Sequence, residues 1–132
     1  MQKITKSQAL KMMIGLLTCV IIFHLAIITQ LIPYTIVWAG KLKTVEEMYA
    51  FEAVSISVNL FLITLLFLKG NYIKHRISDK ILNTILWLFV ALFAINTIGN
   101  LMAETQFEKL VFTPLTLLSA ILIWIILRKD RE

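Results

Sequence analysis

Four long apolar segments constrain this chain more than any other feature of its sequence. They cover about residues 12–32, 50–68, 81–102 and 110–127, and each is near the roughly 20 residues that an α-helix needs to cross a bilayer. Hydrophobic residues make up 59% of the 132 residues and charged residues only 16%, whereas a soluble domain is about a quarter charged. The sequence therefore predicts an all-α polytopic membrane protein, a single membrane domain made of four transmembrane helices.

Local signals predict where two of these helices end or begin. Pro33 is expected to end the first helix, because proline cannot continue the helical hydrogen-bond ladder and disfavours helix in the residue before it. Thr44 stands three residues before Glu47, which predicts a capping box that opens the second helix, or a short interfacial helix leading into it. The first apolar segment is too long for a cleavable signal peptide and has no small-residue cleavage site after it, so we expect it to be retained.

Lysine and arginine are unevenly divided between the two sides of the predicted bundle. Because cytoplasmic loops carry the excess of basic residues, this bias predicts a multi-pass protein of the inner or plasma membrane with cytoplasmic N- and C-termini. The same bias argues against a dual-topology transporter, which needs nearly balanced loops. Ten of the thirteen basic residues lie on the predicted cytoplasmic side (Lys3, Lys6, Lys11, Lys69, Lys74, Arg76, Lys80, Arg128, Lys129 and Arg131), and Lys41, Lys43 and Lys109 lie on the other.

Several functional classes find no support in the sequence. The net charge is +5, but the basic residues flank apolar segments and form no stripe interleaved with aromatics, so no nucleic-acid partner is predicted. A single cysteine, Cys19, allows no intrachain disulfide. The chain has no CxxC, HExxH, GxSxG or glycine-rich phosphate loop. His24 and His75 are predicted on opposite sides of the membrane, so they are not expected to share a metal. The leading prediction includes no metal, cofactor or catalytic residue.

Polar residues inside the predicted spans gather in their outer halves. Glu52 lies near the outer surface of the second span, and Asn59 lies about 10 Å deeper on the same face. Ionisable groups in spans usually face the bundle interior or a water-filled cavity. We therefore expect a polar cup that opens to the extracytoplasmic side above a dry inner plug, with Trp38 in the aromatic belt at the outer interface. The predicted ligand-binding residues are Glu52, Asn59, His24, Asn96, Asn100 and Gln30.

A structural role for the same residues is the main alternative. Serine, threonine and asparagine in membrane helices commonly form interhelical hydrogen bonds worth around 0.6 kcal/mol each. Gly99 and Ala103 have the spacing of two small residues that allows close helix contact. These polar residues could therefore hold helices together without lining a cavity.

Three segments carry a resemblance to a known group of proteins. They are "VWAGKL" at 37–42, "EEMYAFE" at 46–52, and "INTIGNLMAETQFEKL" at 95–110 with the following "FTPLTLLSAILIWIILRK". With these segments the chain resembles small bacterial four-helix integral membrane proteins, which implies a fold and a location only. A looser similarity is to the EXPERA and DoxX-like bundles, which bind hydrophobic ligands among their helices. The chain also echoes itself, since Phe51–Glu52 and Phe107–Glu108 open the second and fourth spans, as a duplicated hairpin would.

These observations lead to three functional hypotheses. The first is a protein that binds or helps to transport a small amphipathic ligand in the outer cup, with Glu52 as the charged anchor. The second is a non-catalytic accessory or assembly subunit whose polar residues only join helices. The third is a membrane-embedded isomerase-like enzyme with Glu52 and His24 as acid and base. The expected partners are the lipid bilayer and the ligand, and homo-oligomerisation is left open.

Overall fold

The computed structural model describes residues 3–128 of the chain, and all regular structure in that part is helical. Four helices are long and apolar enough to cross a membrane, which is consistent with a multi-pass membrane protein. Lys129 and Arg131, which contribute to the predicted charge bias, lie outside the described residues. In chain order the elements are α1 (Lys6–Ile28), the 3₁₀ turns η1 (Tyr34–Ile36) and η2 (Trp38–Gly40), α2 (Val45–Lys69), α3 (Asp79–Leu101), the π-helical turn η3 (Glu108–Phe112) and α4 (Thr113–Leu127).

Side-chain caps determine where α1, α2 and α3 begin. The hydroxyl groups of Thr5, Thr44 and Ser78 each accept a hydrogen bond from the backbone N–H three residues further on. Such caps satisfy an N–H that has no partner within the helix. The predicted cap at Thr44 is confirmed, although the Glu47 carboxylate accepts from the Lys43 N–H at 2.9 Å, one residue before the cap.

The end of α1 differs from the prediction that Pro33 terminates it. The helix stops at Ile28, because Gln30 takes a left-handed conformation (φ 62°) and its N–H donates to the Ile27 carbonyl at 2.9 Å. Thr29 reinforces this end, since its hydroxyl donates to the carbonyls of Leu25 and Ala26. The first span is therefore displaced toward the N-terminus, to 6–28.

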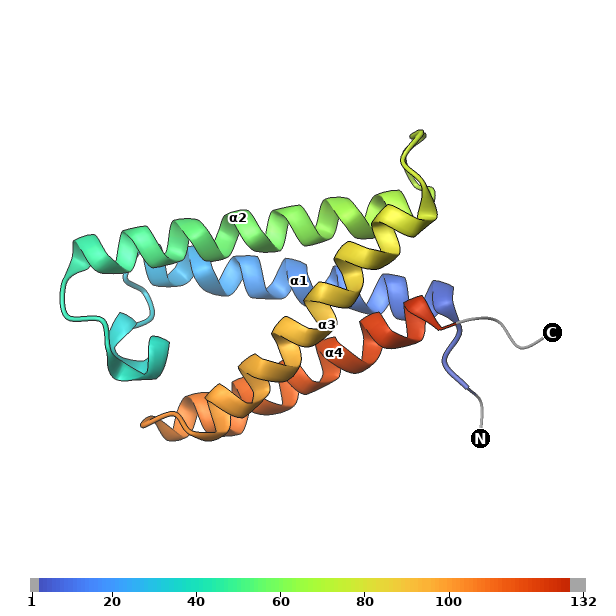
Figure 1. Cartoon of the computed structure of the whole chain (residues 1–132). Helices are drawn as coiled ribbons and strands as arrows, with labels where there is room; N and C mark the ends of the chain where they lie inside the picture. The colour runs from blue at the N-terminus through green and yellow to red at the C-terminus, as the bar shows by residue number, and fades with distance from the viewer. Residues whose placement is uncertain (1–2, 129–132) are drawn as a thin grey trace.

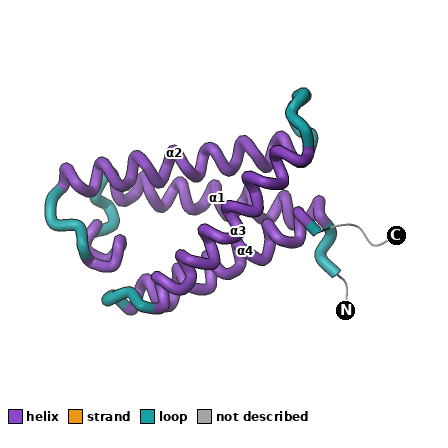
Figure 2. The backbone as a smooth tube through the Cα atoms, viewed as in Figure 1, coloured by secondary structure: helices purple, strands orange, loops and turns teal. Residues whose placement is uncertain are grey.

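The helices form two antiparallel hairpins, α1–α2 and α3–α4, that cross each other (Figure 1). The hairpins lie close together at the end that carries the α2–α3 connection and both chain termini, which we call the joined end. They diverge at the opposite end, the splayed end, where the residues between α1 and α2 extend across the space between them (Figures 1 and 2).

Apolar side chains fill the joined end. Its buried cluster draws on all four helices and includes Met13, Leu17, Leu66, Leu86 and Ile123, each at most 1% exposed. None of the six predicted ligand-binding residues belongs to this cluster. A smaller buried cluster at the splayed end consists of Ile27, Val37, Leu42 and Met48.

Gly99 does not make the close helix contact that its spacing with Ala103 predicts. A Cβ atom added at Gly99 would meet no other atom within 4 Å among the described residues. Gly99 lies on an exposed face of α3, away from the other three helices of the chain.

Candidate functional site

Glu52 is the most deeply buried charged residue among those described, with an exposed fraction of 0%. Its Oε2 contacts Nδ1 of His24, and its Oε1 accepts a hydrogen bond from the indole N–H of Trp38 at 3.0 Å. The three side chains come from α2, α1 and η2. Both carboxyl oxygens therefore have a partner, as a buried carboxyl group requires.

The antiparallel hairpin explains why His24 and Glu52 meet. His24 stands four residues before the end of α1 and Glu52 seven residues after the start of α2. At a rise of about 1.5 Å per residue, both lie roughly 6 to 10 Å from the splayed end of their helices. Similar depth on adjacent helices lets the two side chains approach. The depths estimated from the sequence were compatible with this contact.

Trp38 reaches Glu52 from a strained backbone position. Its φ is 55°, and a left-handed conformation costs a residue with a side chain roughly 1 to 2 kcal/mol. The ring packs on Phe51 with a centroid distance of 4.8 Å, and 37% of the residue is exposed. Its indole N–H is directed at a buried carboxyl group, a contact that the prediction of an interfacial position does not include.

The segment that carries Trp38 also contacts the second hairpin. The Thr105 hydroxyl, in the α3–α4 turn, donates to the Ile36 carbonyl at 3.2 Å. Gly40 has a φ of 71°, and a Cβ there would lie 3.5 Å from Oε2 of Glu104 in the same turn. The residues between α1 and α2 therefore connect the two hairpins at the splayed end.

Aromatic rings of α1 and of the residues before α4 add further contacts between the two hairpins. Phe23 of α1 stacks on Phe107 at a centroid distance of 6.0 Å and meets Phe112 edge-on at 5.3 Å. Phe23 also contacts the His24 ring, at 6.2 Å. These rings place the His24–Glu52 pair beside the α3–α4 hairpin in a largely apolar environment.

A second buried carboxyl group, Glu108, was not among the predicted site residues. It is 2% exposed and begins the π-helical turn η3, a feature often found at functional sites. The sequence places Glu108 in a short outer connection, where a charged residue is unremarkable. The repeated Phe–Glu pair at 51–52 and 107–108 was the signal that could have identified it, because both glutamates are buried.

The structure does not bring the other predicted residues to the His24–Glu52 pair. The Asn59 amide donates to the Ser55 carbonyl of its own helix at 2.7 Å. Asn96 lies exposed on α3, and Gln30 lies exposed in the turn after α1. Asn100 instead donates to Oγ1 of Thr116 at 3.4 Å. Of the six predicted residues, the hydrogen bonds between described residues thus join only His24 and Glu52 directly.

Thr116 and Thr97 form a polar contact within the second hairpin. Their hydroxyl oxygens are 2.9 Å apart, and both residues are 9% exposed. Together with Asn100 they connect α3 to α4, as interhelical hydrogen bonds in membranes do. This group matches the structural alternative for the polar residues, and no hydrogen bond between described residues joins it to Glu52.

Replacing Thr116 with valine is expected to lower the free energy of unfolding by about 1 kcal/mol, because two interhelical contacts of around 0.6 kcal/mol are lost. Unfolding of the purified protein by SDS in mixed micelles would measure the change. Thr64→Val is the matched control, since the exposed Thr64 hydroxyl donates to the Leu60 carbonyl of its own helix. Equal losses for the two variants would contradict an interhelical role for Thr116.

The chemistry available at Glu52 is that of one carboxyl group, one imidazole and one indole. The His24–Glu52 contact can hold and exchange a proton between the two side chains. His75 lies in the α2–α3 connection at the joined end, where its ring makes two hydrogen bonds, whereas His24 lies near the end of α1 at the splayed end. No group of three or more potential metal ligands occurs among residues 3–128.

Comparison of the chain with protein-family models, curated proteins and solved structures finds no match. The resemblance to small bacterial four-helix membrane proteins and the looser one to EXPERA and DoxX-like bundles therefore stay predictions.

Proposed function

We propose that this chain is an integral protein of the cell membrane that binds, or helps to transport, a small amphipathic ligand from the extracytoplasmic side. In this proposal both termini are cytoplasmic, in agreement with the distribution of basic residues. The splayed end then faces outward, and Glu52 is the charged anchor of the ligand. Cell-membrane location and orientation are part of the same proposal.

One observation carries the proposal: a fully buried glutamate whose Oε1 accepts a hydrogen bond from a partly exposed side chain, Trp38. An ionisable residue inside a span is expensive and usually functional. The His24 side chain on Oε2 is 15% exposed and Trp38 is 37% exposed, so Trp38 is the more exposed of the two side chains that contact the carboxyl group.

Displacement of Trp38 would convert this closed arrangement into a ligand site. Rotation of the indole away from Glu52 removes one hydrogen bond and lets the backbone at residue 38 leave its left-handed conformation. A ligand that offers a donor or a positive charge would take the place of the indole N–H at Oε1. The exposed rings of Trp38 and Phe51 would then contact its apolar part.

A binding experiment tests the proposal with tetraphenylphosphonium and tetraphenylborate, two probes of similar shape and opposite charge. The Trp87→Phe, Trp124→Phe background leaves Trp38 as the only indole, so its fluorescence in nanodiscs reports on the site. We expect saturable binding of tetraphenylphosphonium, because a carboxylate and an aromatic face both attract a cation. Glu52→Gln should weaken this binding by at least about tenfold, which corresponds to the loss of one charged contact.

Glu46→Gln is the matched control, because Glu46 is exposed in the first turn of the same helix. It should leave the titration unchanged. Identical titrations for the parent protein and Glu52→Gln would contradict Glu52 as the anchor. Glu52-dependent binding of tetraphenylborate alone would keep a site at Glu52 but contradict its role as a charged anchor.

The accessory-subunit hypothesis has one observation of its own in its favour. Asn96 is exposed on α3 within a predicted span, where an amide would gain hydrogen bonds from the helix of another membrane protein. Asn96→Leu leaves Glu52 intact and separates the two hypotheses. An altered complex size with unchanged probe binding would assign Asn96 to assembly and keep Glu52 as the ligand anchor.

A further inference from the structure

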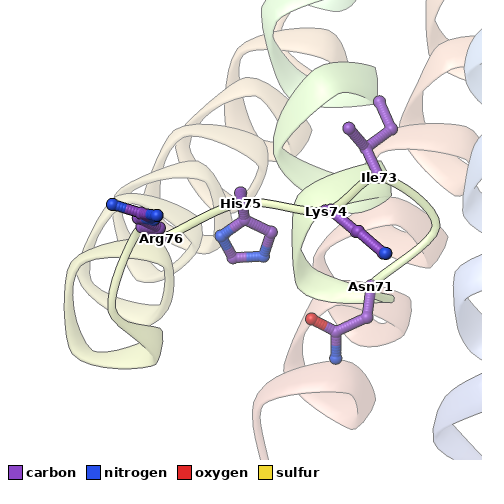
Figure 3. A pocket seen from close by; sticks show the side chains of 5 residues that line it. All are labelled: Asn71, Ile73, Lys74, His75 and Arg76. Carbon is purple, nitrogen blue, oxygen red and sulfur yellow. The ribbon is translucent and has the colours of Figure 1, made fainter.

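Two open hollows lie at the joined end, far from Glu52. One, of about 450 Å³, is lined by Asn71, Ile73, Lys74, His75 and Arg76 in the α2–α3 connection (Figure 3). The other, of about 540 Å³, is lined by Lys3, Ile4, Gln8, Lys11 and Met12 at the start of α1. Each hollow combines two cationic side chains with apolar ones.

Hydrogen bonds give the first hollow a defined backbone. The Ile77 N–H donates to Nδ1 of His75 at 3.1 Å, so the proton of the neutral ring is on Nε2, which donates to the Leu68 carbonyl at 2.8 Å. His75 therefore fastens the connection to the end of α2. Lys74 and Asn71 extend on one side of His75, and Arg76 lies on the other (Figure 3).

Exposed apolar side chains border both hollows. Ile73, in the first hollow, is 51% exposed, and Tyr72 and Ile77 in the same connection are 49% and 44% exposed. Ile4 and Met12 are 37% and 45% exposed at the second. Alternating basic and apolar residues at the end of a span suit the membrane interface, where charged groups meet lipid phosphates and apolar ones meet the upper acyl chain.

We propose that these two hollows bind anionic phospholipids at the joined end of the bundle. Lys74 and Arg76 contact the headgroup in the first hollow, and Lys3 and Lys11 contact it in the second. The glycerol and the first acyl carbons lie against Ile73 in one hollow and against Ile4 and Met12 in the other. This inference does not depend on a ligand at Glu52.

Charge and lining together favour a phospholipid over free phosphate. Basic residues alone would serve either anion, but the exposed isoleucines and methionine have no favourable contact with an inorganic ion. A phospholipid combines an anionic part with an apolar part, as each hollow combines cationic with apolar side chains. Electroneutral phosphatidylcholine matches the apolar lining but lacks the net charge.

The test is a lipid titration of the detergent-solubilised protein, read by native mass spectrometry. Phosphatidylglycerol should occupy two tight sites, and phosphatidylcholine should bind more weakly. Each basic residue near an anionic headgroup contributes about fivefold to binding, so Lys74→Gln with Arg76→Gln should weaken one site by about 25-fold. Lys3→Gln with Lys11→Gln should weaken the other by a similar factor.

Lys41→Gln with Lys43→Gln is the matched control, because it removes two exposed positive charges at the splayed end. Its phosphatidylglycerol binding should equal that of the parent protein. An equal loss in this control, or equal affinity for phosphatidylcholine, would overturn the proposal in favour of unspecific attraction. Displacement of the lipid by inorganic phosphate at similar concentration would overturn it in favour of a phosphate site.

A second variant keeps the proposal testable if the double substitution at 74 and 76 does not fold. Ile73→Ser retains every basic residue and removes apolar contact from the first hollow. We expect phosphatidylglycerol affinity at that site to fall by several fold, as the loss of apolar contact predicts. Unchanged lipid binding in Ile73→Ser would contradict the assigned place of the acyl chain.

Discussion

Replacing Glu52 with alanine is expected to lower the free energy of unfolding by about 3 kcal/mol, because two polar side chains that contact the buried carboxyl group lose their partner. The change leaves Nδ1 of His24 and the indole N–H of Trp38 without the oxygens that they contact. A buried polar group without a partner loses its hydration and gains nothing in return. Trp38 would also lose the contact that offsets its left-handed backbone. Equilibrium unfolding by SDS in mixed micelles measures the difference.

Two further substitutions separate the contributions to this effect. Glu46→Ala, at an exposed position in the first turn of α2, should change stability by less than about 0.5 kcal/mol. Glu52→Gln keeps an oxygen that can accept from Trp38 and should lose only about 1 kcal/mol. A Glu52→Ala variant as stable as Glu46→Ala would show that the contacts of Glu52 do not support the fold.

Leu66→Ala is expected to lower the free energy of unfolding by about 2 kcal/mol, near the low end of the range for large-to-small core substitutions. Leu66 is 0% exposed in the cluster that closes the joined end. The expected loss comes from missing van der Waals contacts around a cavity. The apolar transfer contribution is small, because the leucine would otherwise contact lipid that is equally apolar. The same unfolding titration measures it.

Leu60→Ala is the control for this substitution on the same helix. Leu60 is 51% exposed, so lipid can fill the space that its side chain leaves after truncation. We expect a change of less than about 0.5 kcal/mol. Similar losses at positions 60 and 66 would contradict the assignment of the joined end as the packed core.

The four helices could be predicted because a bilayer demands a minimum length of apolar chain. Each predicted span overlaps one of the four long helices of the structure. The helix ends were less predictable, as α1 shows. Pro33 is a strong local signal, but Thr29 and Gln30 end the helix earlier by bonding the last free carbonyls. Such bonds depend on the turn conformation, which residue identity only biases.

The pairing of His24 with Glu52 was within reach of the sequence, and the positions of the asparagines were not. Depth along a helix follows from residue number and a constant rise, so residues at equal depth can be matched. The direction in which a side chain points around a helix can be predicted only when the helix has one polar and one apolar face. These spans are apolar on nearly all sides, so nothing in the sequence indicated that Asn96 lies exposed or that Asn59 bonds within α2.

The sequence by itself determined the all-helical class, the four spans and the concentration of basic residues at the joined end, because length, hydropathy and charge are properties of the chain alone. Only the tertiary structure decided that Trp38 covers Glu52, that Glu108 is buried and that the hairpins diverge at one end. The physical reason is the same for all three. Each depends on contacts between residues far apart in the chain, and lipid, which accepts any apolar face equally, does not select among the ways in which apolar helices can pack.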